Sequence, residues 1–340
     1  MSLPAQPTPS TSAATWDATA PRGRTRLIEF TAREGTWTSV DVSTDGSWIA
    51  FDLLGHIYRM PAAGGNAVAL TQGSGIASNF HPRISPDGKS VAFISDRAGG
   101  DYNLWVMDAD GRNAHAVAVA PKLRMFFPQW TPDNQYIVVA QDGGEQRELV
   151  MYHRDGGAGV TLLKGTEGRS PFRSSLSVDG RYLYYDVYTA PELPMGHADA
   201  LKGALQLHRY DMQTGTVRAM TNGESGQQNR GSSGGAFAAE PSPDGRWLAF
   251  IRKVPGGTLE YKGQQFGPRS ALWIRDLRSG GERKLMDPVE MDNTESYPLE
   301  GTYPMYRWAA DGNSIVIHQG GKIRSVNVAT GGVSTIPFTA

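Results

Sequence analysis

One short motif, Ser-x-Asp-Gly followed by an apolar run, recurs six times in this chain, with Thr131 and Ala309 at the serine position of two copies, and limits the folds that the chain can adopt. The copies are marked by the aspartates Asp45, Asp87, Asp133, Asp179, Asp244 and Asp311. Asn134 replaces the glycine in the third copy, and both residue types tolerate the left-handed backbone of a tight turn. Successive aspartates are 42, 46, 46, 65 and 67 residues apart. Propeller repeats have periods of about 40–50 residues, so the last two intervals must contain insertions.

The run after each aspartate has hydrophobic residues at consecutive positions. In the first two copies these are Ile49–Phe51 and Val91–Phe93, and the other copies have equivalent runs. Because side chains alternate across a strand, a strand that is apolar at every position is buried on both faces. The blades of a β-propeller provide this environment, since each sheet lies between two neighbours, whereas a two-layer sandwich favours alternation.

Each copy also contains a second apolar stretch and a short final strand, which makes four strands in all. We label them a to d outward from the axis, with the Asp-Gly turn between a and b. The sequence therefore predicts an all-β fold, a six-bladed β-propeller of four-stranded antiparallel blades. We expect residues 1–22 to be a disordered tail or linker and residues 23–340 to form one propeller. The expected blades are residues 36–74, 75–123, 124–168, 169–226, 227–291 and 292–340.

The two ends of the expected propeller share the pattern Ile-x-Phe-Thr-Ala, in Leu27–Ala32 and in Thr335–Ala340. Both segments have the composition of strands, and we expect residues 24–32 to close the ring. In that arrangement both ends lie beside strand c of the last blade, Lys322–Val328. Pro337 has no N–H group, so its segment should be an edge strand or an interrupted one.

Charge and composition exclude several functional classes. The 340 residues include 33 basic and 34 acidic side chains, and a net charge of −1 gives no electrostatic basis for binding nucleic acid or an anionic membrane. The chain has no cysteine, which excludes disulfides, thiolate metal sites and a cysteine nucleophile. Its longest apolar runs span four or five residues, whereas a membrane helix needs about twenty, so no membrane insertion is expected.

The second repeat carries a family resemblance. Pro82–Gly88, Val91–Arg97 and Asn103–Met107 together resemble the repeat of TolB-type propellers. The repeat covers about residues 36–340 of the chain.

A narrower resemblance lies in Glu34–Ser43 and Phe51–Tyr58, which look like the amino-terminal propeller of large exported metal-dependent amidohydrolases. In those proteins a catalytic (β/α) barrel follows the propeller, but its His-x-His ligand pair occurs nowhere in this sequence. The resemblance therefore implies an accessory domain of a hydrolase and not a chain that hydrolyses a substrate itself. It also implies a periplasmic or otherwise exported location.

Local motifs for catalysis or metal binding have simpler explanations. Gly231–Gly235 fits Gly-x-Ser-x-Gly, but a nucleophile elbow lies between a strand and a helix, and this copy lies in the Gly/Ser-rich loop Asn222–Gly235. No two of the seven histidines lie within four residues of each other, so none forms a local metal-ligand pair. Asp108–Gly111 begins like a calcium loop, but its twelfth position would be Val119, so we expect a hairpin turn. We predict no catalytic residue, no metal site and no cofactor on this chain.

A periodic set of polar residues is the most informative constellation. Four positions before each aspartate the residue is polar or charged: Asp41, Arg83, Gln129, Ser175, Glu240 and Arg307. One position later all six residues are apolar: Val42, Ile84, Trp130, Leu176, Pro241 and Trp308. Strand a is innermost in a blade, so the polar side chains should face a water-filled central channel, which needs a polar lining with or without a ligand.

Two positions earlier, on the same side of strand a, the set includes His81 and Arg173. We predict that these two residues and the six polar ones form a ligand site in the channel. Three arginines opposed by Asp41 and Glu240 predict ion pairs across the channel, or an anion bound between arginines. The preferred guest is a carboxylate, such as the carboxy-terminus of a peptide.

Four long segments predict a second working surface. Tyr188–Ala204 and Val254–Ser270 connect strands b and c, while Asn222–Ala236 and Asp287–Tyr303 connect strand d to the next blade. All four therefore fall on one face of the propeller, and loops of such length are functional or disordered. The candidate aromatic anchors of this interface are Tyr261, Phe266, Tyr297 and Tyr303.

The function that we predict is a non-catalytic propeller that binds or positions a partner protein, a peptide or a following catalytic domain. The alternative is an accessory or gating domain of a hydrolase whose catalytic domain lies outside this chain. For that hydrolase an amidohydrolase is preferred, and a serine peptidase of the prolyl-oligopeptidase class is ranked below it.

Overall fold

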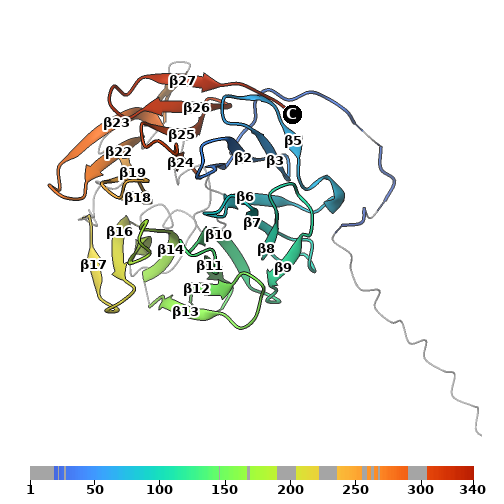
Figure 1. Ribbon diagram of the computed structural model, residues 1–340, viewed down its shortest axis with the longest axis horizontal. Helices are drawn as coiled ribbons and strands as arrows, with labels where there is room; N and C mark the ends of the chain where they lie inside the picture. The colour runs from blue at the N-terminus through green and yellow to red at the C-terminus, as the bar shows by residue number, and fades with distance from the viewer. Residues whose placement is uncertain are drawn as a thin grey trace, which may run out of the picture.

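Six small sheets form a ring in chain order around a central axis in the computed structural model (Figure 1). The structure describes residues 19–21, 23–26, 28–144, 146–166, 169–189, 204–221, 236–254, 259–261, 264–266, 269–289 and 305–340. Each sheet of the ring has four antiparallel strands, and the chain runs through them in the order a, b, c, d. The predicted fold class, an all-β six-bladed propeller, is confirmed.

The first three blades contain twelve of the strands. In the order a to d these are β1 (Val40–Val42), β2 (Trp48–Leu53), β3 (His56–Pro61) and β5 (Val68–Ala69); β6 (Asn79–Ile84), β7 (Ser90–Ser95), β8 (Asn103–Asp108) and β9 (His115–Ala118); and β10 (Arg124–Trp130), β11 (Tyr136–Asp142), β12 (Glu148–His153) and β13 (Val160–Lys164).

The last three blades follow the same order. They contain β14 (Arg169–Leu176), β15 (Tyr182–Thr189), β16 (Ala204–Asp211) and β17 (Val217–Ala219); β18 (Ala236–Pro241), β19 (Trp247–Lys253), β22 (Ser270–Asp276) and β23 (Glu282–Val289); and β24 (Arg307–Trp308), β25 (Ser314–Gln319), β26 (Lys322–Asn327) and β27 (Val333–Ile336).

Side chains of the repeat motif stabilise its turns, as the first blade illustrates. In the first blade the Ser43 hydroxyl donates to Asp45 Oδ1 at 2.6 Å and accepts the Trp48 amide at 3.1 Å. Hydrogen bonds from the Ser43 hydroxyl, and then from the Ser47 amide and hydroxyl, lower the pKa of Asp45 to about 2. Gly46 has a φ of 70° and Asn134 a φ of 61°, which is the left-handed backbone predicted for this position.

The b strands are buried on both faces, as their continuous apolar runs predict. Every residue of β2 and of β7 is buried, including the large side chains of Phe51 and Phe93. These side chains pack between neighbouring blades, and a larger cluster of buried residues extends continuously from the third blade to the sixth.

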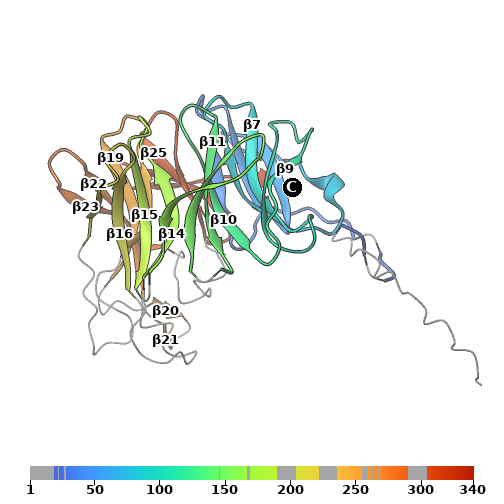
Figure 2. The same ribbon diagram turned by 90° about the horizontal axis from the view of Figure 1, so that it is seen from below.

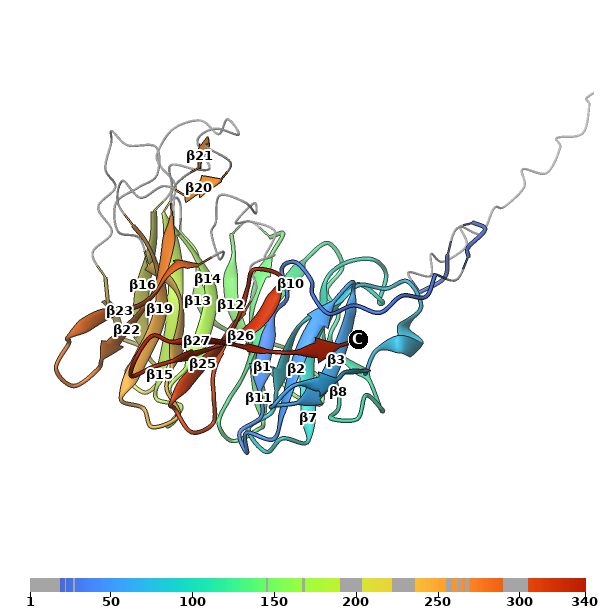
Figure 3. The same cartoon turned by 90° about the horizontal axis from the view of Figure 1, so that it is seen from above.

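Ring closure differs from the prediction in one half. β27 pairs with strand c of the last blade, β26, as expected, and the chain then crosses to the first blade after Pro337. There β28 (Phe338–Thr339) pairs in parallel with β4 (Gly65–Asn66) (Figure 3). Phe338 is buried, and its ring centroid lies 5.0 Å from that of Phe51. Burial of this aromatic ring favours the crossing, and Pro337 cannot continue the β27 ladder.

The amino-terminal segment meets the end of the chain without forming the predicted strand. Residues 28–32 form no strand, and Ile28 and Phe30 are exposed. Ala32 exchanges two hydrogen bonds of 2.9 Å with the backbone of Ala340, and just beyond the predicted segment the Gly35 amide donates to the Gly321 carbonyl at 3.0 Å. The apolar side chains of Ile28 and Phe30 have no blade surface to cover, so their β propensity is not used.

One face of the ring carries a projecting hairpin. β20 (Leu259–Tyr261) and β21 (Gln264–Phe266) pair beyond the ends of the blade strands (Figure 2). Most of the expected tail, residues 1–18 and 22, and most of the four long segments lie outside the described residues. Among the described residues, no helix is long and apolar enough to cross a membrane.

Candidate functional site

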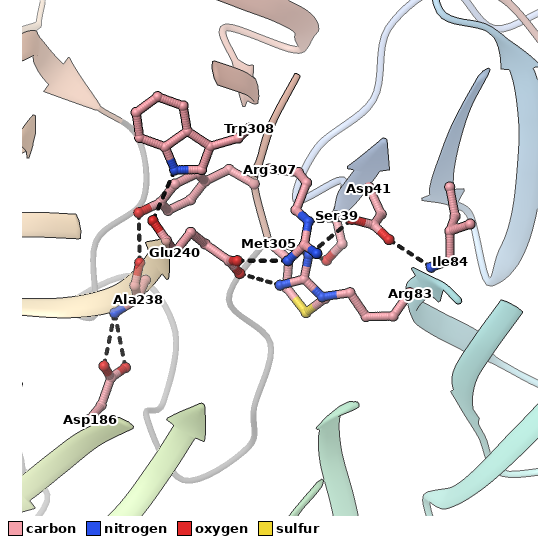
Figure 4. A network of polar contacts seen from close by, with 11 residues as sticks. Ser39, Asp41, Arg83, Ile84, Asp186, Ala238, Glu240, Met305, Arg307 and Trp308 are labelled. Carbon is pink, nitrogen blue, oxygen red and sulfur yellow. Dashed lines mark hydrogen bonds and ion pairs between the residues drawn. The ribbon is translucent and has the colours of Figure 1, made fainter. Parts of the chain in front are cut away.

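Four charged side chains from four blades form one network at the centre of the ring (Figure 4). Arg83 contacts Asp41 with 3.1 Å between Nη1 and Oδ1, and its Nη2 pairs with Glu240. Arg307 contacts the same two carboxylates, with Nε 3.3 Å from Asp41 Oδ1 and Nη1 2.9 Å from Glu240 Oε2. The predicted ion pairs across the channel are confirmed.

This network closes the channel, so the prediction of a water-filled lining is wrong. Asp41, Arg83 and Glu240 are each at most 2% exposed, and only the Arg307 side chain, at 30%, reaches solvent. Two arginines and two carboxylates balance each other, because a buried charge without a partner is costly. Since their charges are already neutralised, Arg83 and Arg307 do not need a bound carboxylate between them.

A second layer of buried residues lies on the same side of strand a. The His81 ring stacks on Phe127 with 4.4 Å between ring centroids, and the Arg173 guanidinium lies 4.5 Å from the Phe127 ring. Both predicted residues are buried, so the structure places them beneath the surface of the ring. Burial lowers the pKa of Arg173, and the negative charge of Asp186 opposes that shift.

Strand a contains a β-bulge next to this buried layer, and buried carboxylates accept hydrogen bonds from some of the backbone amides in the bulge. His81 and Ala238 have φ values of 54° and 58°. Asp52 Oδ2 accepts the His81 amide at 2.8 Å, and Asp186 Oδ1 accepts the Ala238 amide at 2.9 Å. Burial raises the pKa of both Asp52 and Asp186 to about 7. Asp52 and Asp186 are not among the predicted site residues, although each lies seven positions after a motif aspartate, within an otherwise apolar run.

Beyond the charged network, on the face of the a–b turns, there is a hollow of about 210 Å³ that we call the funnel. Its wall contains the apolar residues at the ends of the a strands: Val42, Ile84, Trp130, Leu176, Pro241 and Trp308. Its rim contains one residue from each a–b turn: Thr44, Pro86, Pro132, Val178, Pro243 and Ala310. Arg83, Gln129 and Arg307 also line it, and they form its floor.

Two tryptophans of the wall are fixed by hydrogen bonds to the preceding blade. Trp130 Nε1 donates to the carbonyl of Arg83 at 3.0 Å, and Trp308 Nε1 donates to the carbonyl of Glu240 at 2.9 Å. Each indole thereby has a defined orientation, with its polar atom satisfied and its ring on the funnel. The periodic apolar set in the sequence contains the signal for this wall, but apolar composition alone does not show that these residues border an open hollow.

Gln129 has an unsatisfied polar atom at the floor of the funnel. The residue is 5% exposed, and within the described part of the chain its side-chain oxygen Oε1 has no hydrogen-bond partner. A buried acceptor without a donor costs about 1–3 kcal/mol. The funnel therefore offers a ligand an apolar wall above a floor of paired charges. Ser175, also predicted, is fully buried and does not line the funnel.

The predicted interface on the opposite face cannot be assembled from the described residues. Tyr297 and Tyr303 lie outside them, and for Tyr261 and Phe266 only the backbone of β20 and β21 is described. Gly231–Gly235 also lies outside them. The turn at Asp108–Gly111 is a hairpin, closed by a hydrogen bond of 2.8 Å from the Gly111 amide to the Asp108 carbonyl. Among the described residues, no three His, Asp or Glu side chains are placed to hold a metal ion.

Comparison with solved structures identifies the type of propeller. The chain superimposes on the putative TolB of Agrobacterium tumefaciens with a TM-score of 0.56 and 18% identity, over 81% of this chain and 86% of that one. TolB of Acinetobacter baumannii gives a TM-score of 0.58 and 14% identity, over 88% of this chain and 63% of that one. The fold is that of a TolB-like six-bladed propeller.

Sequence comparison links part of the TolB-like propeller to a hydrolase. The chain is 35% identical over 85 residues to an uncharacterized peptidase, YuxL, of Bacillus subtilis, and this covers 25% of the chain and 12% of the peptidase. The match therefore spans about an eighth of that relative's length. No family model matches the chain. The resemblance to amidohydrolase propellers stays a prediction.

Proposed function

We propose that this TolB-like propeller is a non-catalytic binding module that holds a segment of a partner protein in the funnel. The observation that carries the proposal is the funnel's apolar wall, to which all six blades contribute one residue each. An apolar concavity with few polar groups is the usual form of a recognition site. This binding face is opposite to the one that the long loops favour in the sequence.

The funnel suits an apolar side chain or a short chain segment. Trp130 and Trp308 are oriented by their hydrogen bonds before any ligand arrives, so little conformational entropy is lost on binding. The charged floor is internally paired, which favours an uncharged group at the base over the carboxylate expected from the sequence.

Peptide selection tests the proposal. A displayed library of random peptides is selected on the immobilised chain, and the dissociation constant of an enriched peptide is measured for wild type, Thr44→Arg and Thr25→Arg. Thr44 is exposed on the funnel rim, and Thr25 is exposed away from it. Thr44→Arg should weaken binding about tenfold or more, and Thr25→Arg should change it less than about twofold. The absence of any enriched peptide, or equal affinity for both variants, would contradict the proposal.

The partial match to a peptidase favours a second proposal, that the module serves a hydrolase as an accessory domain. The funnel would then hold a segment of the catalytic domain or of its substrate. The gene that encodes this chain tests this: a coding region for a catalytic domain in the same reading frame would support it. Export of the chain is part of the same proposal and is tested by fractionating cells that express the complete gene product.

A further inference from the structure

A cleft of about 690 Å³ lies between the fourth and fifth blades, on the same face as the funnel. Its two sides come from β15–β17 and from the segment around β22, so it runs outward between neighbouring sheets. Ser177, Val178, Pro241 and Pro243 line both the cleft and the funnel. A chain seated in the funnel can therefore continue over these residues into the cleft.

Four arginines line this cleft: Arg209, Arg218, Arg275 and Arg278. Arg275 is held in place, since its Nη1 donates to the Met220 carbonyl at 2.6 Å, and it lies 3.6 Å from Glu282 Oε1. Within the described residues, no carboxylate lies within ion-pair distance of the other three arginines. The whole chain has a net charge of −1, so the positive charge of the cleft is a local arrangement.

The two acidic residues that line the cleft are engaged in their own turns. Asp179 Oδ1 accepts the Ser177 hydroxyl at 2.6 Å and the Arg181 amide at 3.1 Å. Asp244 Oδ1 accepts the Ser242 hydroxyl at 2.5 Å in the same way. Among the described residues, neither carboxylate lies within ion-pair distance of an arginine of the cleft, so two of the cleft's charges are negative and four are positive.

A tyrosine in the wall of the cleft also orients one of the four arginines. The Arg209 guanidinium lies 4.2 Å from the centroid of the Tyr182 ring, and the neighbouring Tyr184 lines the same cavity. Stacking on an aromatic face restricts a guanidinium and leaves its N–H donors free at the edge. A guanidinium held in this way is suited to carboxylate recognition, because its N–H groups form a planar fork.

We infer that the cleft binds an acidic segment of the same partner whose apolar residue occupies the funnel, an inference that rests on the proposed function. The expected ligand is a peptide with a run of Asp or Glu next to an apolar anchor. The continuity with the funnel favours a peptide over an acidic saccharide, because an apolar wall suits hydrophobic side chains better than a hydroxylated chain.

The test uses fluorescein-labelled octaglutamate as the probe and fluorescence anisotropy at low ionic strength as the readout. The cleft variant is Arg209→Gln with Arg218→Gln and Arg278→Gln. The control variant, Arg24→Gln with Arg26→Gln and Arg112→Gln, makes the same change of net charge at exposed arginines outside the cleft. Thermal melting of both variants verifies that they fold. If the triple cleft variant does not fold, a double variant replaces it, Arg218→Gln with Arg278→Gln, because both of these arginines are exposed.

Wild type and the control variant should bind octaglutamate with similar affinity, and the cleft variant should bind it about tenfold more weakly. Added salt should weaken wild-type binding, because exposed charges are screened. Equal binding by the cleft and control variants, or no binding by wild type, would overturn the inference. Competition by polygalacturonate at the same carboxylate concentration, as strong as that by unlabelled octaglutamate, would also overturn it as a peptide site.

The funnel variant separates this inference from the proposed function. Thr44→Arg should leave octaglutamate binding unchanged, since Thr44 lines only the funnel. If funnel-selected peptides respond to Thr44→Arg and an added tetraglutamate extension gives no gain in affinity, the cleft inference fails alone. If octaglutamate binds in the cleft and no peptide binds the funnel, the proposed function fails, and the link between the two sites with it.

Discussion

Arg83 in the second blade and Glu240 in the fifth form a buried ion pair across the propeller axis. The two residues occupy the same position of strand a in blades that lie opposite each other in the ring. Two further kinds of contact also occur twice, in blades that lie opposite each other in the ring. Trp130 bonds to the second blade as Trp308 bonds to the fifth, and Asp52 accepts an amide of the second blade as Asp186 accepts one of the fifth. The ring therefore has two similar halves that are joined at the axis by opposite charges.

Removal of Arg83 should destabilise the fold strongly. Arg83→Met leaves Glu240 and Asp41 with Arg307 alone, and breaking a buried pair from one side costs about 3–5 kcal/mol. The free energy of unfolding is measured by urea titration with circular dichroism. Arg112→Met is the control, because its pair with Asp110 is exposed and screened by solvent, so its loss should change the stability little. A loss below about 1 kcal/mol for Arg83→Met would contradict a structural role for the network.

The indole hydrogen bond of Trp308 should be measurable. Trp308→Phe keeps a ring on the funnel wall but leaves the Glu240 carbonyl without its donor, which costs about 1–3 kcal/mol. Trp105→Phe is the matched control, since the buried Nε1 of Trp105 has no hydrogen-bond partner in the described structure. Urea unfolding of both variants compares the two indoles. Equal losses of stability would show that ring size, and not the hydrogen bond, determines the effect.

Stability should fall as the pH rises from about 4 to about 7. Burial raises the pKa of Asp52 and Asp186 to about 7, so in this window the folded state keeps protons that the unfolded chain has released. Each carboxyl then contributes a slope of at most about 1.4 kcal/mol per pH unit. Asp186→Asn removes one of these protons and still accepts an amide, so its stability should vary less with pH. The same slope in wild type and variant, measured by urea unfolding, would exclude this assignment.

The carboxyl-terminal residues should contribute more to ring closure than the amino-terminal ones. Phe338→Ala removes a buried ring from the contact with Phe51, and such truncations cost about 3–5 kcal/mol. Phe30→Ala removes an equal ring that is 66% exposed, and its effect should stay within about 0.5 kcal/mol. Thermal and urea unfolding measure both variants. A larger loss for Phe30→Ala would restore the closure predicted from the sequence.

The sequence was sufficient to predict the fold, because the repeat specifies local structure. Ser43 and Asp45 make the turn from side chains within five residues, and the run Ile49–Phe51 specifies a strand that is buried on both faces. Each of these features depends on neighbours along the chain, so it can be read without knowledge of the other blades. Six copies of one such unit then allow few arrangements other than a closed ring.

The site depended on contacts between residues far apart in the chain. The sequence placed Asp41, Arg83, Glu240 and Arg307 near one axis, but the tertiary structure determined that they pair and close the channel. Because these four residues close the channel, the open hollow lies instead against their apolar neighbours, for which the sequence showed only an apolar pattern. The sequence alone could not show that Phe338 packs on the first blade, or which carboxylates accept hydrogen bonds from the amides of the β-bulges. Both outcomes depend on burial against other blades. Burial and charge neutralisation are properties of the assembled ring, whereas turns and strand patterns are properties of its repeat.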